Sequence, residues 1–439
     1  MSVQDYLEKH MLSRKIEEAV NAAVRAKAPD PVLFIAGHMR RAAPAVITKV
    51  RARQILDGHG APAVEVELHT NKAVHRASAA GAGAPEGTAA AAAGDAERRK
   101  NLARAVADAV RVINDKVSEA LVGLDPQQQT QIDQAIMDLD KARHKAELGA
   151  NAMLAVSIAA CKAGAAEREV PLYKHIADLV GKNATMLPVP AITVINGGRH
   201  AGNALPIQEI MILPVGAKNF EEAMLMGSET YHHLKDIILE KYGSESCNIG
   251  DDGGFAPNIS RQRAGYNGRI KLAINVAATD FCTEYPLVSI EQPFDKDDWE
   301  HSKKLTTLEL CQVVGDDLLM SDPERIKRAV NEYTCNALVL KANQIGTVTE
   351  AIEVVKQAKD AHWGVMVSHR SGDTEDSFIA DLAVGAAAGQ IKAGAPSRGE
   401  CLTKYNQLLR IEDQLGSESS GSEGGQEDHM MCHYKLYVV

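Results

Sequence analysis

Residues 312–370 read QVVGDDLLMSDPERIKRAVNEYTCNALVLKANQIGTVTEAIEVVKQAKDAHWGVMVSHR, and this stretch decides the fold. Short β-rich runs alternate in it with amphipathic segments that have helical spacing. The helix expected near 322–331 has Pro323 in its first turn and Glu324 three residues after Ser321, which is a capping-box signature. Strand–helix alternation of this length predicts parallel β/α units, most economically closed into a barrel.

Working outward, the alternation continues to a short strand at 390–392 and a helix over 400–411. Upstream of about residue 188 the pattern differs, because Val64, Val66 and Leu68 alternate with glutamates and predict a strand meander, followed by helical patterns. We therefore expect an α/β protein in four parts: an N-terminal helical extension at 1–45, an α+β domain at 46–185, a TIM-like barrel domain at 186–415 and a disordered Ser/Gly/Glu-rich tail at 416–439.

The extension contains apolar residues at helical spacing over 4–27, and Pro29 and Pro31 then stop that helix. A second short helix is expected through 32–39. This two-helix unit resembles the dimerisation-and-docking motif of kinase-anchoring regulatory subunits, which implies a docking partner for residues 1–45. A plain amphipathic extension is the alternative interpretation.

Composition excludes several classes of function. The chain has 439 residues, of which 45% are hydrophobic, and a net charge of −10, which disfavours nucleic acid as a partner. Seven cysteines without a CxxC pair indicate a reduced, cytoplasmic protein. The charged start MSVQDYLEKH is unlike a signal peptide, and no apolar stretch approaches the roughly 18 residues that a membrane span needs.

Charged and polar residues follow the apolar runs of the barrel region, at the strand ends where a β/α barrel carries its chemistry. Glu291 and Asp316, with Asn275, offer the hard oxygen ligands that Mg²⁺ prefers. Four cationic or donor side chains at other strand ends offer positive charge to an anionic substrate: Lys341, His369, Arg370 and Lys392. A metal, a lysine base and an acid together suit abstraction of a proton next to a carboxylate.

Eight motifs in residues 46–415 resemble those of the enolase family. They are INGGRHAGN (195–203), QEIMILP (208–214), GDDGGFAPN (250–258), SIEQPFD (289–295), VGDDL (314–318), LKANQIG (340–346), SHRSG (368–372) and IKAGAP (391–396). The resemblance implies an N-terminal α+β domain before a barrel, dehydration of 2-phospho-D-glycerate to phosphoenolpyruvate, two Mg²⁺ ions and a homodimer.

The resemblance also implies roles for individual residues. Lys341 matches the base that takes the C2 proton, Asp252 stands where the family has a Glu that helps the hydroxide leave, and Glu209 and His200 match groups around the substrate. Glu291 and Asp316, with Asn275, match metal ligands close to the substrate. The contacts to phosphate and carboxylate match Ser368, His369, Arg370, Ser371 and Lys392.

The sequence departs from the family pattern at five places. Asn275 replaces a metal-binding Asp, and Asp252 is shorter than the family Glu by one methylene. Both serines of a Ser-Gly-Ala-Ser loop are lost at 81–84, ending at Ala84, and His59 replaces an Arg near the active site. The segments around 253–267 and 276–286 are too short or too irregular for the two barrel helices expected there.

Two functions remain open from the sequence. The first is a working enolase in glycolysis, whose activity these departures would reduce; the second is an impaired enolase relative that acts as a binding or docking protein. A Schiff-base aldolase on a similar barrel is disfavoured, because it would use a Lys without needing acidic strand ends.

Overall fold

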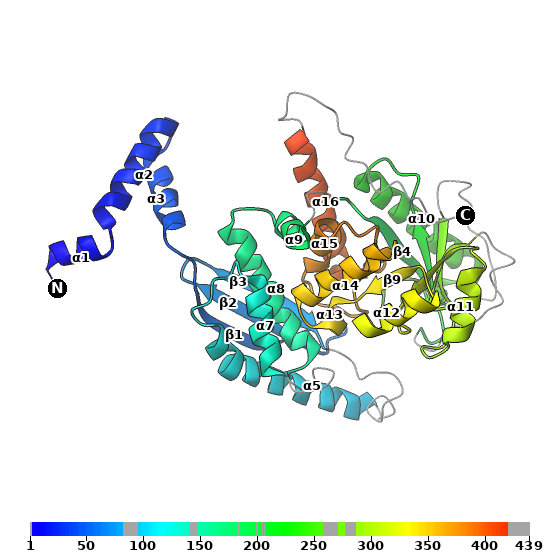
Figure 1. Cartoon of the computed structure of the whole chain (residues 1–439). Helices are drawn as coiled ribbons and strands as arrows, with labels where there is room; N and C mark the ends of the chain where they lie inside the picture. Colours follow the sequence, from blue (N-terminus) through cyan, green and yellow to red (C-terminus); the bar gives the residue numbers. More distant parts are fainter. Residues whose placement is uncertain are drawn as a thin grey trace.

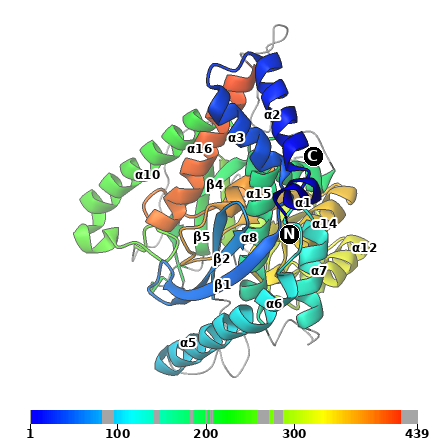
Figure 2. The same cartoon turned by 90° about the vertical axis from the view of Figure 1, so that its left-hand side faces the viewer.

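The computed structural model describes residues 2–81, 95–140, 148–181, 185–198, 201–203, 205, 207–257, 271–276 and 287–419. Three parts follow one another along the chain: a helical extension, an α+β unit and a barrel (Figure 1). The first two helices of the extension lie away from the other two parts in Figure 1, whereas its end contacts the α+β unit: Arg40 donates to the Lys72 carbonyl and Arg41 forms an ion pair with Glu169. The α+β unit and the barrel pack together (Figures 1 and 2).

The extension consists of α1 (Val3–Lys9), α2 (Leu12–Ala26) and α3 (Pro31–Ala42). The single helix predicted over 4–27 is broken between α1 and α2, where Met11 adopts a left-handed conformation with φ of 48°. Asp30 caps α3 by accepting a hydrogen bond from the Leu33 amide, and Pro31 occupies its first turn. Capping by Ser2 and Asp30 therefore sets where α1 and α3 begin, whereas α2 begins after the left-handed Met11 without a side-chain cap.

The α+β unit contains an antiparallel meander of β1 (Ile47–Leu56), β2 (Pro62–Thr70) and β3 (Val74–Ala80), as predicted. Its helical segments are α5 (Asp95–Val112), η1 (Ile113–Val117), α6 (Ser118–Leu121), α7 (Gln129–Leu139), α8 (Ala150–Glu167) and α9 (Leu172–Val180). The helix α8 packs on β2 and β3 and buries nearly its whole surface. Small residues such as Ala152 and Ala155 allow this close approach.

The barrel is closed by eight strands in the order β10-β11-β4-β5-β6-β7-β8-β9. Their bounds are β4 (Val189–Asn196), β5 (Ile207–Leu213), β6 (Lys271–Val276), β7 (Leu287–Glu291), β8 (Gln312–Gly315), β9 (Ala337–Leu340), β10 (Gly364–Ser368) and β11 (Gln390–Lys392). One strand differs from the expected parallel pattern, since β5 pairs antiparallel with both β4 and β6. A parallel neighbour needs a long crossover, whereas β4 and β5 are joined by a short connection.

The helical segments of the barrel region are α10 (Phe220–Tyr242), η2 (Ser244–Cys247), α11 (Trp299–Thr307), α12 (Pro323–Glu332), α13 (Ala342–Ile345), α14 (Val348–Asp360), α15 (Phe378–Gly385) and α16 (Gly399–Ser419). The segment 416–419 was expected to be disordered but is helical, because α16 continues for about a turn beyond the buried Leu415. The rest of the predicted tail lies outside the described residues, as do most of the two segments where helices are expected to be missing.

A barrel without the two missing helices is expected to expose the apolar outer faces of β6 and β7, and the side chains of β6 lie outside the described residues. Ser289 and Glu291 belong to the inner face, where Ser289 donates a hydrogen bond to Gln312, so Val288 and Ile290 lie on the outer one. Both are nevertheless buried, with 9% and 1% of their surface exposed, and Ile290 belongs to the main hydrophobic core. The expectation of exposure is therefore wrong for this strand.

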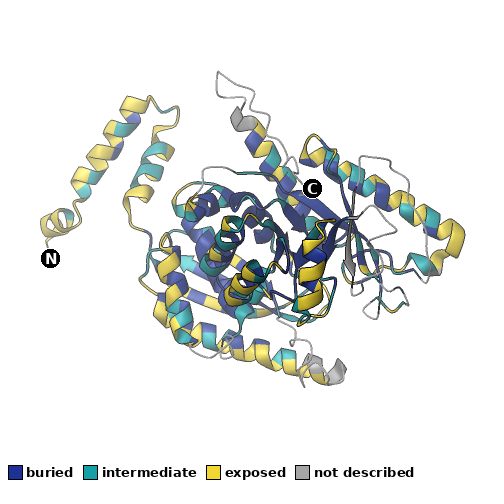
Figure 3. Ribbon diagram, turned by 45° about the vertical axis from the view of Figure 1, so that its right-hand side comes forward, coloured by how far each residue is buried: buried dark blue, intermediate teal, exposed yellow. Residues whose placement is uncertain are grey.

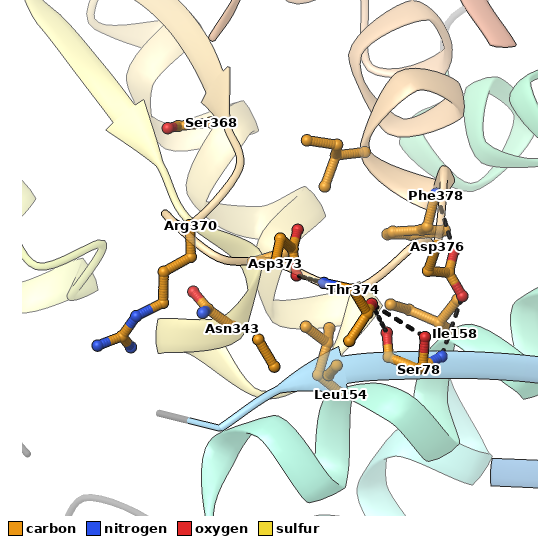
Figure 4. A pocket seen from close by; sticks show the side chains of 14 residues that line it. Ser78, Leu154, Ile158, Asn343, Ser368, Arg370, Asp373, Thr374, Asp376 and Phe378 are labelled. Atoms are coloured by element: carbon orange, nitrogen blue, oxygen red, sulfur yellow. Dashed lines mark hydrogen bonds between the residues drawn. The ribbon is translucent and has the colours of Figure 1, made fainter. Parts of the chain in front are cut away.

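The α+β unit is held on the barrel at the loop that follows β10. Ser78 of β3 exchanges hydrogen bonds with Thr374, and its amide donates to the Asp376 carboxylate (Figure 4). Lys162 of α8 forms an ion pair with Asp376 at 2.8 Å. A cavity of about 30 Å³ remains between the two parts at this point. The same loop carries Arg370 and Ser371, so these contacts lie next to the predicted site.

Asp381 in α15 gives a test of this packing. Burial raises its pKa to about 7, despite a hydrogen bond from Gln407. The folded chain therefore keeps a proton that the unfolded chain loses near pH 4, so this group reduces stability as pH rises from about 4 to 7, by roughly 1.4 kcal/mol per unit. Asp381→Asn should gain stability relative to the unmodified chain as pH rises through that range, measured by urea unfolding.

The matched control is Asp360→Asn at the exposed end of α14, which should shift the pH profile little. Parallel stability–pH curves for the Asp381→Asn variant and the unmodified chain would contradict the assignment.

Candidate functional site

The strand register brings acidic and amide residues to one level of the barrel. Glu209 pairs with Asn196 on one side and with Asn275 on the other, and Asn275 pairs with Glu291. Glu209 lies near the start of β5, yet it reaches the carboxyl ends of the other strands because β5 runs antiparallel. Glu209, Asn275 and Glu291 therefore stand on adjacent strands at the end of the barrel that carries the site.

Lys392, the last residue of β11, lies between two carboxylates. Its Nζ is 2.6 Å from Glu291 Oε1 and 3.2 Å from Glu209 Oε2, and the residue is 5% exposed. Burial alone would lower the pKa of Lys392, but these carboxylates outweigh it and raise the pKa well above its usual value. Lys392 is therefore a fixed positive charge.

Lys341 follows β9 and pairs with Asp316, which follows β8. The Lys341 Nζ lies 2.6 Å from Asp316 Oδ2. Burial opposes the charge on Lys341, yet Asp316 and Glu291 raise its pKa above the usual value. Lys341 carries its proton in this arrangement.

Glu291 and Asp316 are neighbouring buried carboxyl groups joined by a hydrogen bond. Burial raises the pKa of Glu291 to about 7, and the charges of Asp316 and Glu209 add to this effect. Burial would also raise the pKa of Asp316, but Lys341 and Lys392 lower it. The pair thus favours one shared proton over two negative charges.

This pair fits a divalent cation. The Oδ1 atom of Asp316 is buried and has no hydrogen-bond partner among the described residues, and oxygen is the ligand that Mg²⁺ prefers. No group of three or more His, Cys, Asp or Glu side chains in the described ranges is arranged for a metal, so a third ligand from the described residues would be of another type. The amide of Asn275 is such a group by its place in the register; its side chain is outside what the structure describes.

A second acidic pair lies on the other side of Lys392. Asp252 and Glu209 share a hydrogen bond, and His369 Nε2 lies 3.2 Å from Asp252 Oδ1. Burial raises the pKa of Glu209, although Lys392 opposes this. For Asp252 burial acts in the same direction, but His369 and Lys392 hold its pKa well below the usual range. Glu209 is thus the proton donor of this pair.

The loop after β10 supplies groups for an anion. The Arg370 guanidinium makes no hydrogen bond or ion pair with the described residues, and in Figure 4 it extends away from the Ser78–Thr374 contact. The Ser371 hydroxyl is buried without a described partner. The Ser368 hydroxyl donates to the His369 carbonyl at 2.8 Å.

Most of the predicted site residues are therefore brought together. Direct side-chain contacts join seven of them into one chain: His369, Asp252, Glu209, Lys392, Glu291, Asp316 and Lys341. Ser368, Arg370 and Ser371 lie on the adjoining loop. His200 lies outside the described residues, and so does Ala84.

Two supporting residues were missed by sequence reasoning. Thr193 of β4 donates a hydrogen bond to Glu209 Oε1, and Gln292 accepts hydrogen bonds from the amides of Asp316 and Leu318. Gln292 adopts a left-handed conformation with φ of 48°, which is uncommon for a residue of its type. Nothing in residue type or spacing separates these two from ordinary strand and turn residues.

None of the helices in the described ranges is long and apolar enough to cross a lipid bilayer.

Comparison with known proteins gives two family matches. Residues 47–176 match the family model "Enolase, N-terminal domain". Residues 184–284 and 278–428 match "Enolase, C-terminal TIM barrel domain". The C-terminal match is thus made in two pieces that overlap at 278–284, within the short connection between β6 and β7.

Individual relatives agree. The chain is 58% identical over 464 aligned positions to "Cytosolic enolase 3" of Arabidopsis thaliana, covering 95% of this chain and 98% of that protein. It is 50% identical to "Enolase" of Solanum lycopersicum, covering 85% of this chain and 97% of that protein. It is 48% identical to "Enolase 2" of Hevea brasiliensis, with coverage of 85% and 96%.

Proposed function

Because the chain belongs to the enolase family of hydro-lyases, we propose that its barrel site converts 2-phospho-D-glycerate to phosphoenolpyruvate and water, as in glycolysis. The observation that carries this proposal is the alternation of charge from Lys341 through Asp316 and Glu291 to Lys392. It offers a lysine for proton abstraction beside acidic groups for a metal and a second, permanently charged lysine.

Glu291 and Asp316, together with Asn275, would hold Mg²⁺. When bound, the metal supplies Lewis-acid stabilisation of the negative charge that develops on the substrate carboxylate. The buried Asp316 Oδ1 supports this assignment.

The lysines have different roles. Lys341 is protonated in its ion pair with Asp316, so it would act as the base for the C2 proton only after losing that proton, which a cation bound by Asp316 would favour. The electron pair of the C–H bond then moves into the substrate carboxylate. Lys392 cannot serve as the base, since Glu209 and Glu291 keep it charged. Its charge instead faces the carboxylate on which negative charge develops, a form of electrostatic stabilisation.

The Glu209–Asp252 pair completes the reaction. The electron pair returns from the carboxylate to form the C2–C3 double bond as the C3–O bond breaks, and the hydroxide leaves as water with the proton that this pair holds. Arg370 and Ser371, with Ser368 and His369, offer donors to the phosphate, and His200 is expected to lie near the substrate. These roles follow from the family motifs. The Ser371 hydroxyl, which has no described partner, supports them, whereas the Ser368 hydroxyl would have to turn away from the His369 carbonyl.

The second candidate is an impaired enolase relative that acts as a binding or docking protein. Asn275 removes one negative charge from the proposed metal site, and Asp252 shortens the acidic group, where a misplacement of about 1 Å can cost on the order of 10² in rate. Exposed apolar residues on the extension, including Val20 and Val24, favour this candidate.

We further propose a cytoplasmic homodimer whose partners are the small phosphorylated acids rather than nucleic acid or membranes. A coupled assay of phosphoenolpyruvate formation during Mg²⁺ titration separates the two candidate functions.

Lys341→Ala should abolish the exchange of the C2 proton of 2-phosphoglycerate with solvent deuterium, followed by NMR. Loss of a positioned base removes about 10²–10⁴ in rate. Lys303→Ala, at an exposed position of α11, is the matched control and should leave exchange unchanged. Exchange retained in the Lys341→Ala variant would refute the assignment of the base.

Asn275→Asp should tighten Mg²⁺ binding, by about tenfold if the added charge contributes 1.4 kcal/mol. Titration calorimetry in the absence of substrate measures this directly. Asn331→Asp on the exposed face of α12 adds the same charge away from the site and serves as control. If the Mg²⁺ affinity does not change, the side chain at position 275 does not face the metal.

A further inference from the structure

The turn between β1 and β2 reaches from the α+β unit to the loop that follows β10. Asp57 gives this turn a fixed shape, because its carboxylate accepts a hydrogen bond from the His59 amide at 2.9 Å. The Gly58 amide donates to the Asp373 carbonyl, and the Arg398 side chain donates to the Gly58 carbonyl. The turn is therefore held on the barrel by its own backbone, independently of the His59 side chain.

The two parts that meet at this turn share one hydrophobic core. Val66 of β2 belongs to the same core as Leu340 of β9, and Figure 3 shows buried residues gathered in the middle of the body that the two parts form. Because a protein interior is close-packed, the turn cannot shift relative to the barrel without disturbing this core. A side chain on the turn can thus act as a fixed support for the barrel loop.

The ring of His59 fills the space beside Gly372. A Cβ added to Gly372 would collide with this ring, and the three atoms nearest to it, Nδ1, Cε1 and Cγ, all belong to His59. At the other end of the ring, Nε2 lies 3.5 Å from Asp251 Oδ1, and Asp251 directly precedes Asp252 of the site. The ring therefore lies between the loop after β10 and the loop that carries Asp252.

The backbone at Gly372 also requires a glycine. Its φ is 67°, a left-handed conformation that glycine adopts without the steric cost that other residues have. The bend at this position and the close approach of the ring thus occur at the same residue. Glycine is flexible by itself, so the packed ring restricts a position that the loop sequence leaves free.

The two residues before Gly372 are those that the loop offers to an anion. The Ser371 hydroxyl is buried and has no hydrogen-bond partner among the described residues. Burial lowers the pKa of Arg370, and the charges of Asp373 and Asp57 oppose this effect. The β1–β2 turn therefore acts on the loop both through contact at Gly372 and through the charge of Asp57 near Arg370.

We infer that His59 is a positioning residue for phosphate binding, an inference that rests on the proposed function. The ring supports Gly372 in its left-handed conformation and so fixes the direction in which Ser371 presents its hydroxyl. His59 acts through the shape of its ring and through Ser371, without touching the substrate.

Titration calorimetry with 2-phosphoglycerate and Mg²⁺ tests this role without requiring turnover. His59→Ala should weaken binding about tenfold, with little change in melting temperature, because the backbone bonds of the turn remain. His59→Gln should restore binding, since its planar amide can cover Gly372 and donate to Asp251.

His69→Ala, in β2, is the matched control and should bind normally. The side chain of His69 is 31% exposed and lies 3.7 Å from the Glu67 carboxylate, whereas that of His59 is 35% exposed and lies beside Asp251. The two histidines thus differ chiefly in the contact with Gly372.

A double-mutant cycle isolates that contact. Gly372→Ala should weaken binding by more than tenfold in the unmodified chain, because the added Cβ displaces the ring. In the His59→Ala background the same change should cost only a few-fold, since the collision is gone and only the backbone strain remains. Equal losses in the two backgrounds would show that the ring and the glycine act independently.

Unchanged affinity in the His59→Ala variant would overturn the positioning role. A loss of affinity that His59→Gln shares in full would also overturn it, because the imidazole itself would then contact the phosphate. A loss that follows a fall in melting temperature would show a role in folding only. Failure of the unmodified chain to bind 2-phosphoglycerate would instead overturn the proposed function, and the positioning role with it.

Discussion

The buried ammonium of Lys392 is the constraint on which the site depends. A charge that is 5% exposed is costly unless it is paired, and Lys392 is paired with Glu209 on β5 and Glu291 on β7. These strands are separated by β6 in the barrel, so the lysine ties three strands across the mouth. The ion pairs that hold these three strands together therefore also place the acidic groups of the site.

Position 275 matters because of this charge balance. The contact chain contains four carboxyl groups, Glu209, Asp252, Glu291 and Asp316, against two lysines and His369. Asn275 stands in register between Glu209 and Glu291, where another carboxylate would increase the repulsion that a metal must relieve. The amide makes the site easier to fold without a cation and gives the cation less to bind.

The sequence predicts much of the fold because its signals are local. The strand at 390–392 has the predicted bounds, and α12 begins within about one residue of expectation, since apolar periodicity and turn residues act over a few residues. The predicted cap of α12 is wrong by one residue, because Asp322 and not Ser321 accepts the hydrogen bonds of its first turn. The sequence did not predict the antiparallel direction of β5, because this direction depends on how β5 pairs with β4 and β6. The left-handed Met11 that divides the first helix also has no signal in residue type. In the site, charged strand ends were identifiable by pattern, whereas the contact of His59 with Gly372 joins residues more than 300 positions apart.

The α+β unit contributes to the proposed active site by holding the loop after β10 in place. Asp373 accepts a hydrogen bond from Gly58, Thr374 bonds Ser78, and the fully buried Lys404 of α16 donates to the Thr374 carbonyl at 2.6 Å. Each tie comes from a different segment, so the loop is fixed by packing between the two parts and not by its own sequence. Arg370 and Ser371 precede Asp373 and Thr374 by a few residues, so the same contacts fix where they lie. A change that loosens the α+β unit on the barrel therefore acts first on the groups offered to the phosphate and only indirectly on Lys341, which is held by Asp316 within the barrel itself.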